Sequence, residues 1–163
     1  MNKIKYIFAD IDGVLTDGKV YIDAEDNEHK CICYHDLDAI GKGRRNGLEF
    51  AFITGEDTFM AHFIAKRFKV PKAIFGCKDK EAAVKRLLEE LKLEREEISY
   101  IGDAERDIPA IKLSGLGAAP ADALKSVRDA ADVVLERRGG EGALMDLVTY
   151  IIETSNAQAE DIK

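Results

Sequence analysis

Two carboxylates, Asp10 and Asp12, follow a short apolar segment and precede a glycine at position 13. Side chains two residues apart on a strand point to the same side, so both carboxylates face one direction where the strand ends. Like charges this close raise each other's pKa or require a cation, which favours a metal ion, a shared proton or both. A carboxylate at this place can also act as a nucleophile and form an aspartyl-phosphate. A solvated turn is the plain alternative, because Asp and Gly are common in loops.

Three further polar clusters follow apolar segments: Thr54-Gly55-Glu56, Lys80, and Asp103 with Asp107. Phosphoryl transfer needs a nucleophile, a cation, donors to the equatorial oxygens and an acid for the leaving group. Asp10 suits the first role, and Asp12 suits the last, because it can protonate the leaving alcohol and then activate water. Thr54 offers a hydroxyl and a backbone N–H to a phosphoryl oxygen, and Lys80 offers the balancing positive charge.

The acidic residues also form a plausible magnesium site. Mg²⁺ prefers carboxylate and carbonyl oxygens and keeps several waters. The expected ligands are therefore the carboxylates of Asp10 and Asp103 and the carbonyl of Asp12. Asp107, four residues after Asp103, is expected to order metal-bound water from behind the ligands.

Apolar strands alternate with amphipathic helices along the chain, which indicates an α/β fold. The expected strands are 4–9, 48–53, 73–75, 98–101, a short one after 115, and 133–135; the expected helices are 36–46, 57–68, 79–91, 106–113, 121–130 and 141–152. This order predicts a Rossmann-like three-layer α/β/α arrangement around a central parallel sheet. Such sheets bind ligands at the carboxyl ends of their strands, where all four polar clusters are expected. Taken singly, each cluster could also be a turn, a helix N-terminus or a solvated charge. Because all four are expected at the same edge of the sheet, a functional site is favoured over these alternatives.

The chain is expected to form one domain over residues 1–153, with a polar tail at 154–163. Segments 19–23 and 29–34 predict a small β-hairpin flap at about 18–35, in place of a large cap domain. His29, Cys31, Cys33 and His35 alternate along its second strand, which suggests a zinc site. Four such ligands would spread over about 20 Å, too far for one tetrahedral ion, so packing in the hairpin or at a subunit contact is favoured.

The composition of the chain limits the classes of binding partner and the cellular compartment that are expected. The chain has 163 residues, 46% of them hydrophobic, and a formal net charge of −7. An acidic protein is poorly suited to nucleic acid or to anionic membranes, and no apolar segment is long enough to span a bilayer. No signal peptide is expected at the start of the sequence. Three cysteines do not make a disulfide framework, which favours a reducing cytoplasm.

The chain resembles the haloacid dehalogenase superfamily of phosphohydrolases. It is most similar to the small subfamily without a large cap domain that includes 3-deoxy-D-manno-octulosonate 8-phosphate phosphatase. The resemblance covers about residues 4–153 and rests on these segments: 10–18, the hairpin, 53–55, Gly76 before Lys80, 100–103, and 138–143. Asp10, Asp12, Thr54, Lys80, Asp103 and Asp107 match the family's catalytic positions one for one.

The resemblance implies a Mg²⁺-dependent phosphatase that removes the terminal phosphate of a 2-keto-3-deoxy sugar acid through an aspartyl-phosphate. It also implies a homotetramer, in which the hairpin and the C-terminal Gly-rich segment of one subunit help to close a neighbour's active site. Arg138, at the start of that Gly-rich segment, is then expected to contact substrate as a planar fork. A solvated pair with Arg137 is the alternative.

The chain departs from the family pattern at Phe75, within residues 35–40, and at Ala104 and Glu56, and these departures leave the substrate open. Ala104 stands where relatives usually carry a second Asp, so a catalytically faded member acting as an assembly or regulatory module in sialic acid-type sugar activation is the alternative function. Glu56 stands where octulosonate enzymes tend to have Arg, and it resembles the branch acting on nonulosonate 9-phosphates. Because a carboxylate bonds sugar hydroxyls where Arg would pair with a carboxylate, this residue can shift preference. A phosphatase of unrelated substrates is a further alternative.

Overall fold

The computed structural model describes residues 4–160, and it contains a six-stranded parallel sheet in the order β5-β4-β1-β6-β7-β8. The strands are β1 (Tyr6–Ala9), β4 (Glu49–Ile53), β5 (Ala73–Ile74), β6 (Ile98–Ile101), β7 (Leu116–Ala119) and β8 (Val133–Val134). Helices cover both faces, as the alternating pattern predicted, so the expected α/β/α class is confirmed.

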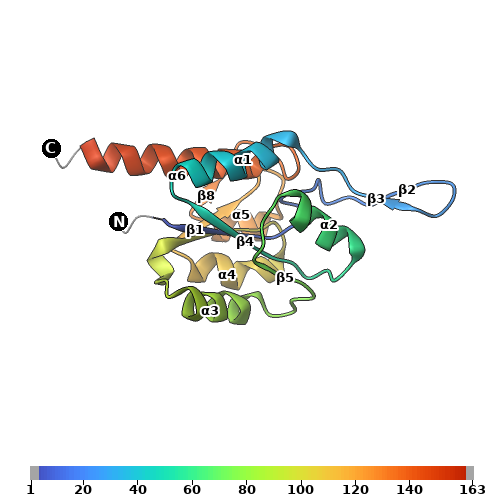
Figure 1. Ribbon diagram of the computed structural model, residues 1–163, viewed down its shortest axis with the longest axis horizontal. Coiled ribbons are helices and arrows are strands. Elements are labelled where there is room, and N and C mark those ends of the chain that lie inside the picture. The colour runs from blue at the N-terminus through green and yellow to red at the C-terminus, as the bar shows by residue number, and fades with distance from the viewer. Residues whose placement is uncertain (1–3, 161–163) are drawn as a thin grey trace.

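Two groups of helices form the outer layers (Figure 1). Their bounds are α1 (Tyr34–Arg45), α2 (Phe59–Arg67), α3 (Lys80–Leu91), α4 (Ile108–Leu113), α5 (Lys125–Ala130) and α6 (Ala143–Glu160). Helices α1 and α6 lie together on one face of the sheet, and α3 and α4 cover the other face. Short 3₁₀ turns at Arg95–Glu97 and Glu105–Asp107 precede β6 and α4.

Strand β1 occupies the middle of the sheet, between β4 and β6. Ile7 and Ala9 belong to the core beneath α1 and α6, and Phe8 belongs to the core beneath α3 and α4. All three side chains are completely buried, which explains why the strand is continuously apolar rather than alternating. The carboxyl end of β1 therefore lies directly between the ends of its two neighbours.

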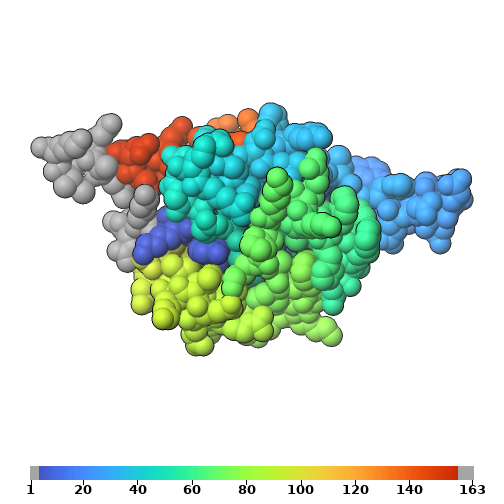
Figure 2. Space-filling model, in the orientation of Figure 1, coloured from blue at the N-terminus to red at the C-terminus, as the bar shows by residue number. Residues whose placement is uncertain are grey.

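The hairpin flap is present, but its strands are shorter than predicted: β2 covers Tyr21–Ile22 and β3 covers Glu28–His29. The Asp23 carboxylate accepts hydrogen bonds from two backbone N–H groups of the turn that follows, which ends β2 early. Helix α1 already begins at Tyr34, so the predicted strand alternation from His29 to His35 was wrong. Figure 2 shows the flap projecting well beyond the body of the molecule.

Helix α6 is longer than predicted and runs to Glu160, so most of the expected tail at 154–163 is helical. Residues 154–160 contain neither Gly nor Pro, and their Ala, Gln and Glu residues favour helix, so nothing local ends it. Residues 161–163 lie outside the described part of the chain. Between residues 4 and 160, no helix combines the length and the apolar character that crossing a membrane requires.

Asp36 connects α1 to the start of α6. Its buried carboxylate accepts hydrogen bonds from the backbone N–H groups of Gly142 (3.1 Å) and Leu144 (2.9 Å). These donors lie at the N-terminal end of α6, where N–H groups without a helical partner need an acceptor. Burial raises the pKa of Asp36 to about 6, although the backbone donors oppose the shift. A single side chain thus joins two helices that are distant in sequence.

Candidate active site

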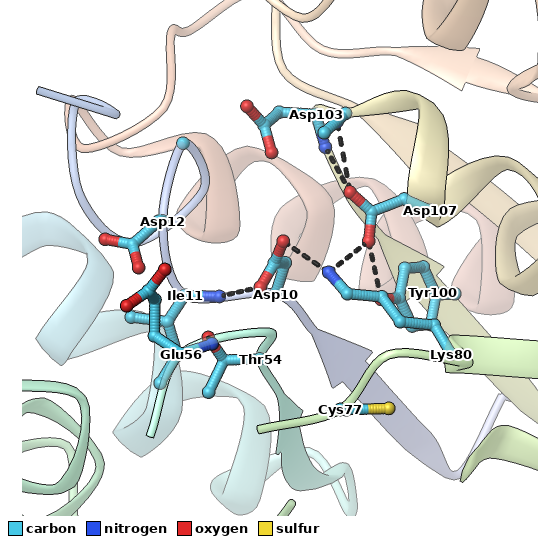
Figure 3. A network of polar contacts seen from close by, with 12 residues as sticks. Asp10, Ile11, Asp12, Thr54, Glu56, Cys77, Lys80, Tyr100, Asp103 and Asp107 are labelled. Carbon is cyan, nitrogen blue, oxygen red and sulfur yellow. Dashed lines mark hydrogen bonds and ion pairs between the residues drawn. The ribbon is translucent and has the colours of Figure 1, made fainter. Parts of the chain in front are cut away.

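Asp10 follows the last residue of β1 and lies at the floor of a cavity. Its Oδ1 accepts a hydrogen bond from the Ile11 N–H (2.8 Å), and its Oδ2 lies 2.5 Å from the Lys80 amine (Figure 3). The side chain is almost completely buried, and this desolvation raises the pKa of Asp10 to about 7 despite the attraction of Lys80. The carboxylate is therefore held in one orientation, in surroundings that favour a further positive charge.

Lys80 is the first residue of α3, and it points back beneath the floor of the cavity. The helix starts there because Asp79 caps it, accepting a hydrogen bond from the Ala82 N–H. The ammonium bridges Asp10 and Asp107, with a distance of 2.6 Å to the latter (Figure 3). Burial lowers the pKa of Lys80, but the two carboxylates raise it by more, so the lysine stays charged. The solvated alternative for Lys80 is wrong, because its side chain is completely buried.

Asp107 is also completely buried, and both of its oxygens are occupied. Oδ1 accepts from Lys80 and from the hydroxyl of Tyr100 (2.8 Å). Oδ2 accepts from the backbone N–H groups of Asp103 (3.2 Å) and Ala104 (3.0 Å). With four donors around it, Asp107 fixes the loop that carries Asp103. Tyr100 was not predicted as a site residue, because its position inside a buried strand gives no signal of a polar role.

Asp103 completes a group of three acids. Carboxylate oxygens of Asp10, Asp103 and Asp107 lie within 4.8 Å of one another. Burial, with Asp107 adding to it, raises the pKa of Asp103 to about 6. Gly13 allows this approach: its φ is +81°, and a Cβ there would collide with the Asp103 carboxylate. Three carboxylates this close together favour a cation, and an all-oxygen donor set suits Mg²⁺, so these residues fit the expected metal.

The side chain of Asp12 lies beside the three clustered acids rather than among them. Its Oδ1 accepts from Lys30 (2.7 Å) and from the hydroxyl of Thr16 (3.3 Å). Its Oδ2 is buried and has no hydrogen-bond partner among the residues that the structure describes. That oxygen is available to exchange a proton with a bound molecule. Lys30 comes from the flap and was missed by the sequence analysis, because a lysine in a polar hairpin has no distinguishing pattern.

Thr54 and its two successors form the third side of the site. Thr54 is buried at the end of β4, where its hydroxyl accepts a hydrogen bond from the Glu56 N–H (3.2 Å). Gly55 and the exposed Glu56 lead away from the strand and line the cavity. Thr54 therefore belongs to a turn after the strand, which was the alternative to a functional role. The turn nevertheless faces Asp10 rather than open solvent (Figure 3).

The cavity has a volume of about 600 Å³, within the range of small-molecule sites. Six of the predicted site residues line it: Asp10, Asp12, Thr54, Gly55, Glu56 and Asp103. Lys80 and Asp107 lie beneath its floor. The rest of the lining comes from the flap, from Ala104 and Arg106, and from the residues at the start of α2, which are Thr58, Phe59 and Met60.

Arg138, which was expected to contact substrate, does not line the cavity of this chain. Its Nε lies 3.3 Å from the Asp122 carboxylate, and its side chain is 59% exposed outside the cavity lining. The adjoining Gly139 and Gly140 pack on the loop that follows Asp12, where a Cβ on either would collide with backbone. The Gly-rich segment therefore touches the catalytic loop through its backbone.

Known proteins resemble the chain over nearly all of its length. The family model of the haloacid dehalogenase-like hydrolases matches residues 76–144 of the sequence. The 3-deoxy-D-manno-octulosonate 8-phosphate phosphatase of Haemophilus influenzae is 30% identical over 153 residues, which cover 94% of this chain and 85% of that protein.

Solved structures agree with the sequence matches. The same enzyme from Moraxella catarrhalis, crystallised with a magnesium ion, a phosphate ion and the sugar acid KDO, has a TM-score of 0.87 and 27% identity, covering 98% of this chain and 94% of that one. The cobalt-bound enzyme from Haemophilus influenzae has a TM-score of 0.86 and 30% identity, covering 93% and 88%. The chain therefore belongs to the haloacid dehalogenase-like hydrolases and, within them, to the phosphoric monoester hydrolases of the 3-deoxy-D-manno-octulosonate 8-phosphate phosphatase-like group.

Proposed function

We propose that this chain removes the terminal phosphate from a 2-keto-3-deoxy sugar acid phosphate, through an aspartyl-phosphate on Asp10. One observation carries the proposal: a buried lysine bridges Asp10 and Asp107 at the floor of a cavity whose rim holds Asp12 and Thr54. This arrangement offers a fixed nucleophile, a positive charge behind it and an acid beside it, as phosphoryl transfer requires.

The reaction begins when an Asp10 carboxylate oxygen attacks phosphorus and the ester P–O bond breaks. Asp12, whose Oδ2 has no hydrogen-bond partner among residues 4–160, gives a proton to the leaving sugar alkoxide. Thr54 donates its hydroxyl to a phosphoryl oxygen, and Lys80 keeps Asp10 oriented and balances its charge. Asp12 then takes a proton from water as that water attacks the aspartyl-phosphate. Inorganic phosphate leaves, and the Asp10 carboxylate is restored.

Magnesium is the cofactor that the donor set favours. Asp10, Asp103 and the carbonyl of Asp12 would hold it, and Asp107 would orient its surroundings. When bound, Mg²⁺ neutralises the charge of the phosphoryl oxygens. The relative from Moraxella catarrhalis was crystallised with this ion, which supports the choice.

The proposed assay measures phosphate release from octulosonate 8-phosphate, nonulosonate 9-phosphate and simple sugar phosphates, with Mg²⁺ and with a chelator. We expect turnover that requires Mg²⁺ and is highest with a sugar acid. No turnover of any phosphate would instead favour the assembly or regulatory module in sialic acid-type sugar activation, to which Ala104 gives some support. A preference for unrelated phosphates would reject the proposed substrate class.

Glu56 is proposed to influence the choice between eight- and nine-carbon substrates. It is an exposed carboxylate in the cavity lining, free to accept hydrogen bonds from sugar hydroxyls. We expect Glu56→Arg to shift the ratio of kcat/KM for octulosonate 8-phosphate over nonulosonate 9-phosphate by about tenfold or more. Asp57→Asn, at an exposed acid outside the lining, serves as the control. An unmoved ratio would rule out the role of Glu56.

We also propose a homotetramer in the cytoplasm. Three free cysteines support the reducing compartment. Tyr21 and Ile22 on the flap are 47% and 64% exposed, and Phe59 on α2 is 80% exposed. These apolar side chains suit burial against neighbouring subunits, which would also enclose the cavity. Light scattering should give the mass of four chains; a monomer would contradict the shared closure of the site.

A further inference from the structure

Arg106 stands at the edge of the active-site cavity and has no part in the reaction described above. It lies in the 3₁₀ turn Glu105–Asp107, directly before the buried Asp107 that anchors this loop. Arg106 itself is exposed. Arg137 and Arg138 pair with carboxylates of their own, whereas Arg106 forms no ion pair within residues 4–160. It is also the only arginine of the described residues that lines the cavity.

The guanidinium lies directly against Gly55. A Cβ placed on this glycine would come within 2.6 Å of Arg106 Nη1 and 3.7 Å of Cζ, so the present position of the side chain depends on the missing methyl group. Gly55 immediately follows the phosphoryl-binding Thr54. Two segments that are distant in the sequence thus bring a planar cation to the wall of the cavity.

The charge of the cavity makes this cation significant. Five acids line it: Asp10, Asp12, Glu28, Glu56 and Asp103. Lys30 is already paired with Asp12, and Lys80 is buried between two carboxylates. Among residues 4–160, Lys19 and Arg106 are then the cations of the lining that form no ion pair, and of these Arg106 is the one that lies against Gly55, beside Thr54. The planar fork of arginine matches a carboxylate with two parallel hydrogen bonds, which a lysine cannot offer.

The position of Arg106 indicates which anionic group it meets. In a 2-keto-3-deoxy sugar acid phosphate, the carboxylate and the terminal phosphate lie at opposite ends. The phosphoryl group belongs at the buried Asp10, so the carboxylate points towards the exposed side of the cavity. Ala104, which also lines the cavity, brings no charge that would repel it. We propose that Arg106 is a specificity-determining residue that binds the substrate carboxylate, an inference that rests on the proposed function.

The test compares Arg106→Met with wild type on two substrates: a 2-keto-3-deoxy sugar acid phosphate and a ketose phosphate of similar length without a carboxylate. We expect KM for the sugar acid phosphate to rise about 10- to 100-fold, with kcat and the ketose phosphate kinetics changed less than about threefold. Arg106→Lys should recover part of the loss. Arg86→Met, at an exposed arginine of α3 outside the cavity lining, should match wild type.

Three results would overturn the inference: no change in KM, an equal loss on both substrates, or an equal loss in Lys19→Met. An equal loss on both substrates would place Arg106 on the phosphoryl group. An equal loss in Lys19→Met, at another cation of the cavity lining, would indicate only general electrostatic attraction.

Gly55→Ala provides an independent variant, because the group that must move is the end of a flexible side chain. We expect it to raise KM selectively for the sugar acid phosphate, and Arg106→Met should add little in the double variant. Full additivity would contradict a shared site.

Calorimetric binding of the free, dephosphorylated sugar acid separates this inference from the proposed function. If the wild type releases no phosphate but binds the acid, and Arg106→Met does not bind it, the proposed function fails and the inference stands. If turnover is as proposed and Arg106→Met binds the acid as wild type does, the inference alone fails. If the wild type neither turns over nor binds the acid, both fail.

Discussion

Asp10→Asn should reduce phosphate release by about 10⁴-fold or more, because it removes the nucleophile and leaves the rest of the cavity in place. Asparagine has nearly the same size, and its carbonyl can still accept the hydrogen bond that Ile11 donates. Lys80 keeps its second partner, Asp107, so the core should remain folded. Steady-state release of phosphate from the best sugar acid phosphate measures the loss, and thermal unfolding checks the fold.

Rapid quenching with radiolabelled substrate makes the interpretation sharper. The wild type should give an acid-stable phosphoenzyme during turnover, and the Asp10→Asn variant should give none. Asp38→Asn is a matched control, since Asp38 is an exposed acid of α1 outside the cavity lining. A variant that keeps a substantial share of turnover, or that still becomes phosphorylated, would show that another residue is the nucleophile.

Lys80→Met should both stop turnover and destabilise the protein. Methionine keeps most of the length of the side chain but removes the charge that holds Asp10 and Asp107 together. Breaking a buried ion pair by deleting one partner typically costs about 3–5 kcal/mol of the free energy of unfolding, because an uncompensated charge remains. Urea unfolding followed by circular dichroism measures this loss in the metal-free protein.

Two companions make the Lys80 prediction specific. Lys85→Met, one turn along α3 at an exposed lysine paired with Glu81, should leave stability unchanged. The double variant Lys80→Met with Asp107→Asn should recover part of the loss, since it removes one of the stranded charges. Equal stability of Lys80→Met and wild type would mean that the ammonium is not the electrostatic centre of this site.

The sequence was sufficient to predict the sheet and its catalytic edge because both depend on local patterns. Short apolar segments predicted β1, β4 and β6, and the polar residue after each one lies at the cavity. Parallel strands place their carboxyl ends together, so one rule located Asp10, Thr54 and Asp103. The interior position of Lys80 needed the joint argument, since a lysine at the start of a charged helix looks solvated by itself.

The features that were missed depend on contacts between distant parts of the chain. Lys30 reaches Asp12 only because the returning arm of the flap passes beside the catalytic loop at the base of the flap, where Thr16 pairs with Ile32. Arg106 meets Gly55 across the carboxyl end of the sheet. Tyr100 looked like an ordinary core residue until its hydroxyl was placed on Asp107. Neither periodicity nor spacing contains such pairings, since they follow from the order of strands.

The flap is attached to the body of the molecule at its base, and its outer part contains only the short strands β2 and β3. An isolated bridge between Thr16 and Ile32 closes its base, and Asp36 fixes the following helix to α6. The hairpin between Thr16 and Ile32 is thus closed at its base, and the helix that follows it is held against α6. Evolution can therefore exchange the tip of the hairpin, and with it the shape of the substrate entrance, without refolding the catalytic floor. Grafting tips from relatives onto this base is a direct route to enzymes with altered preference.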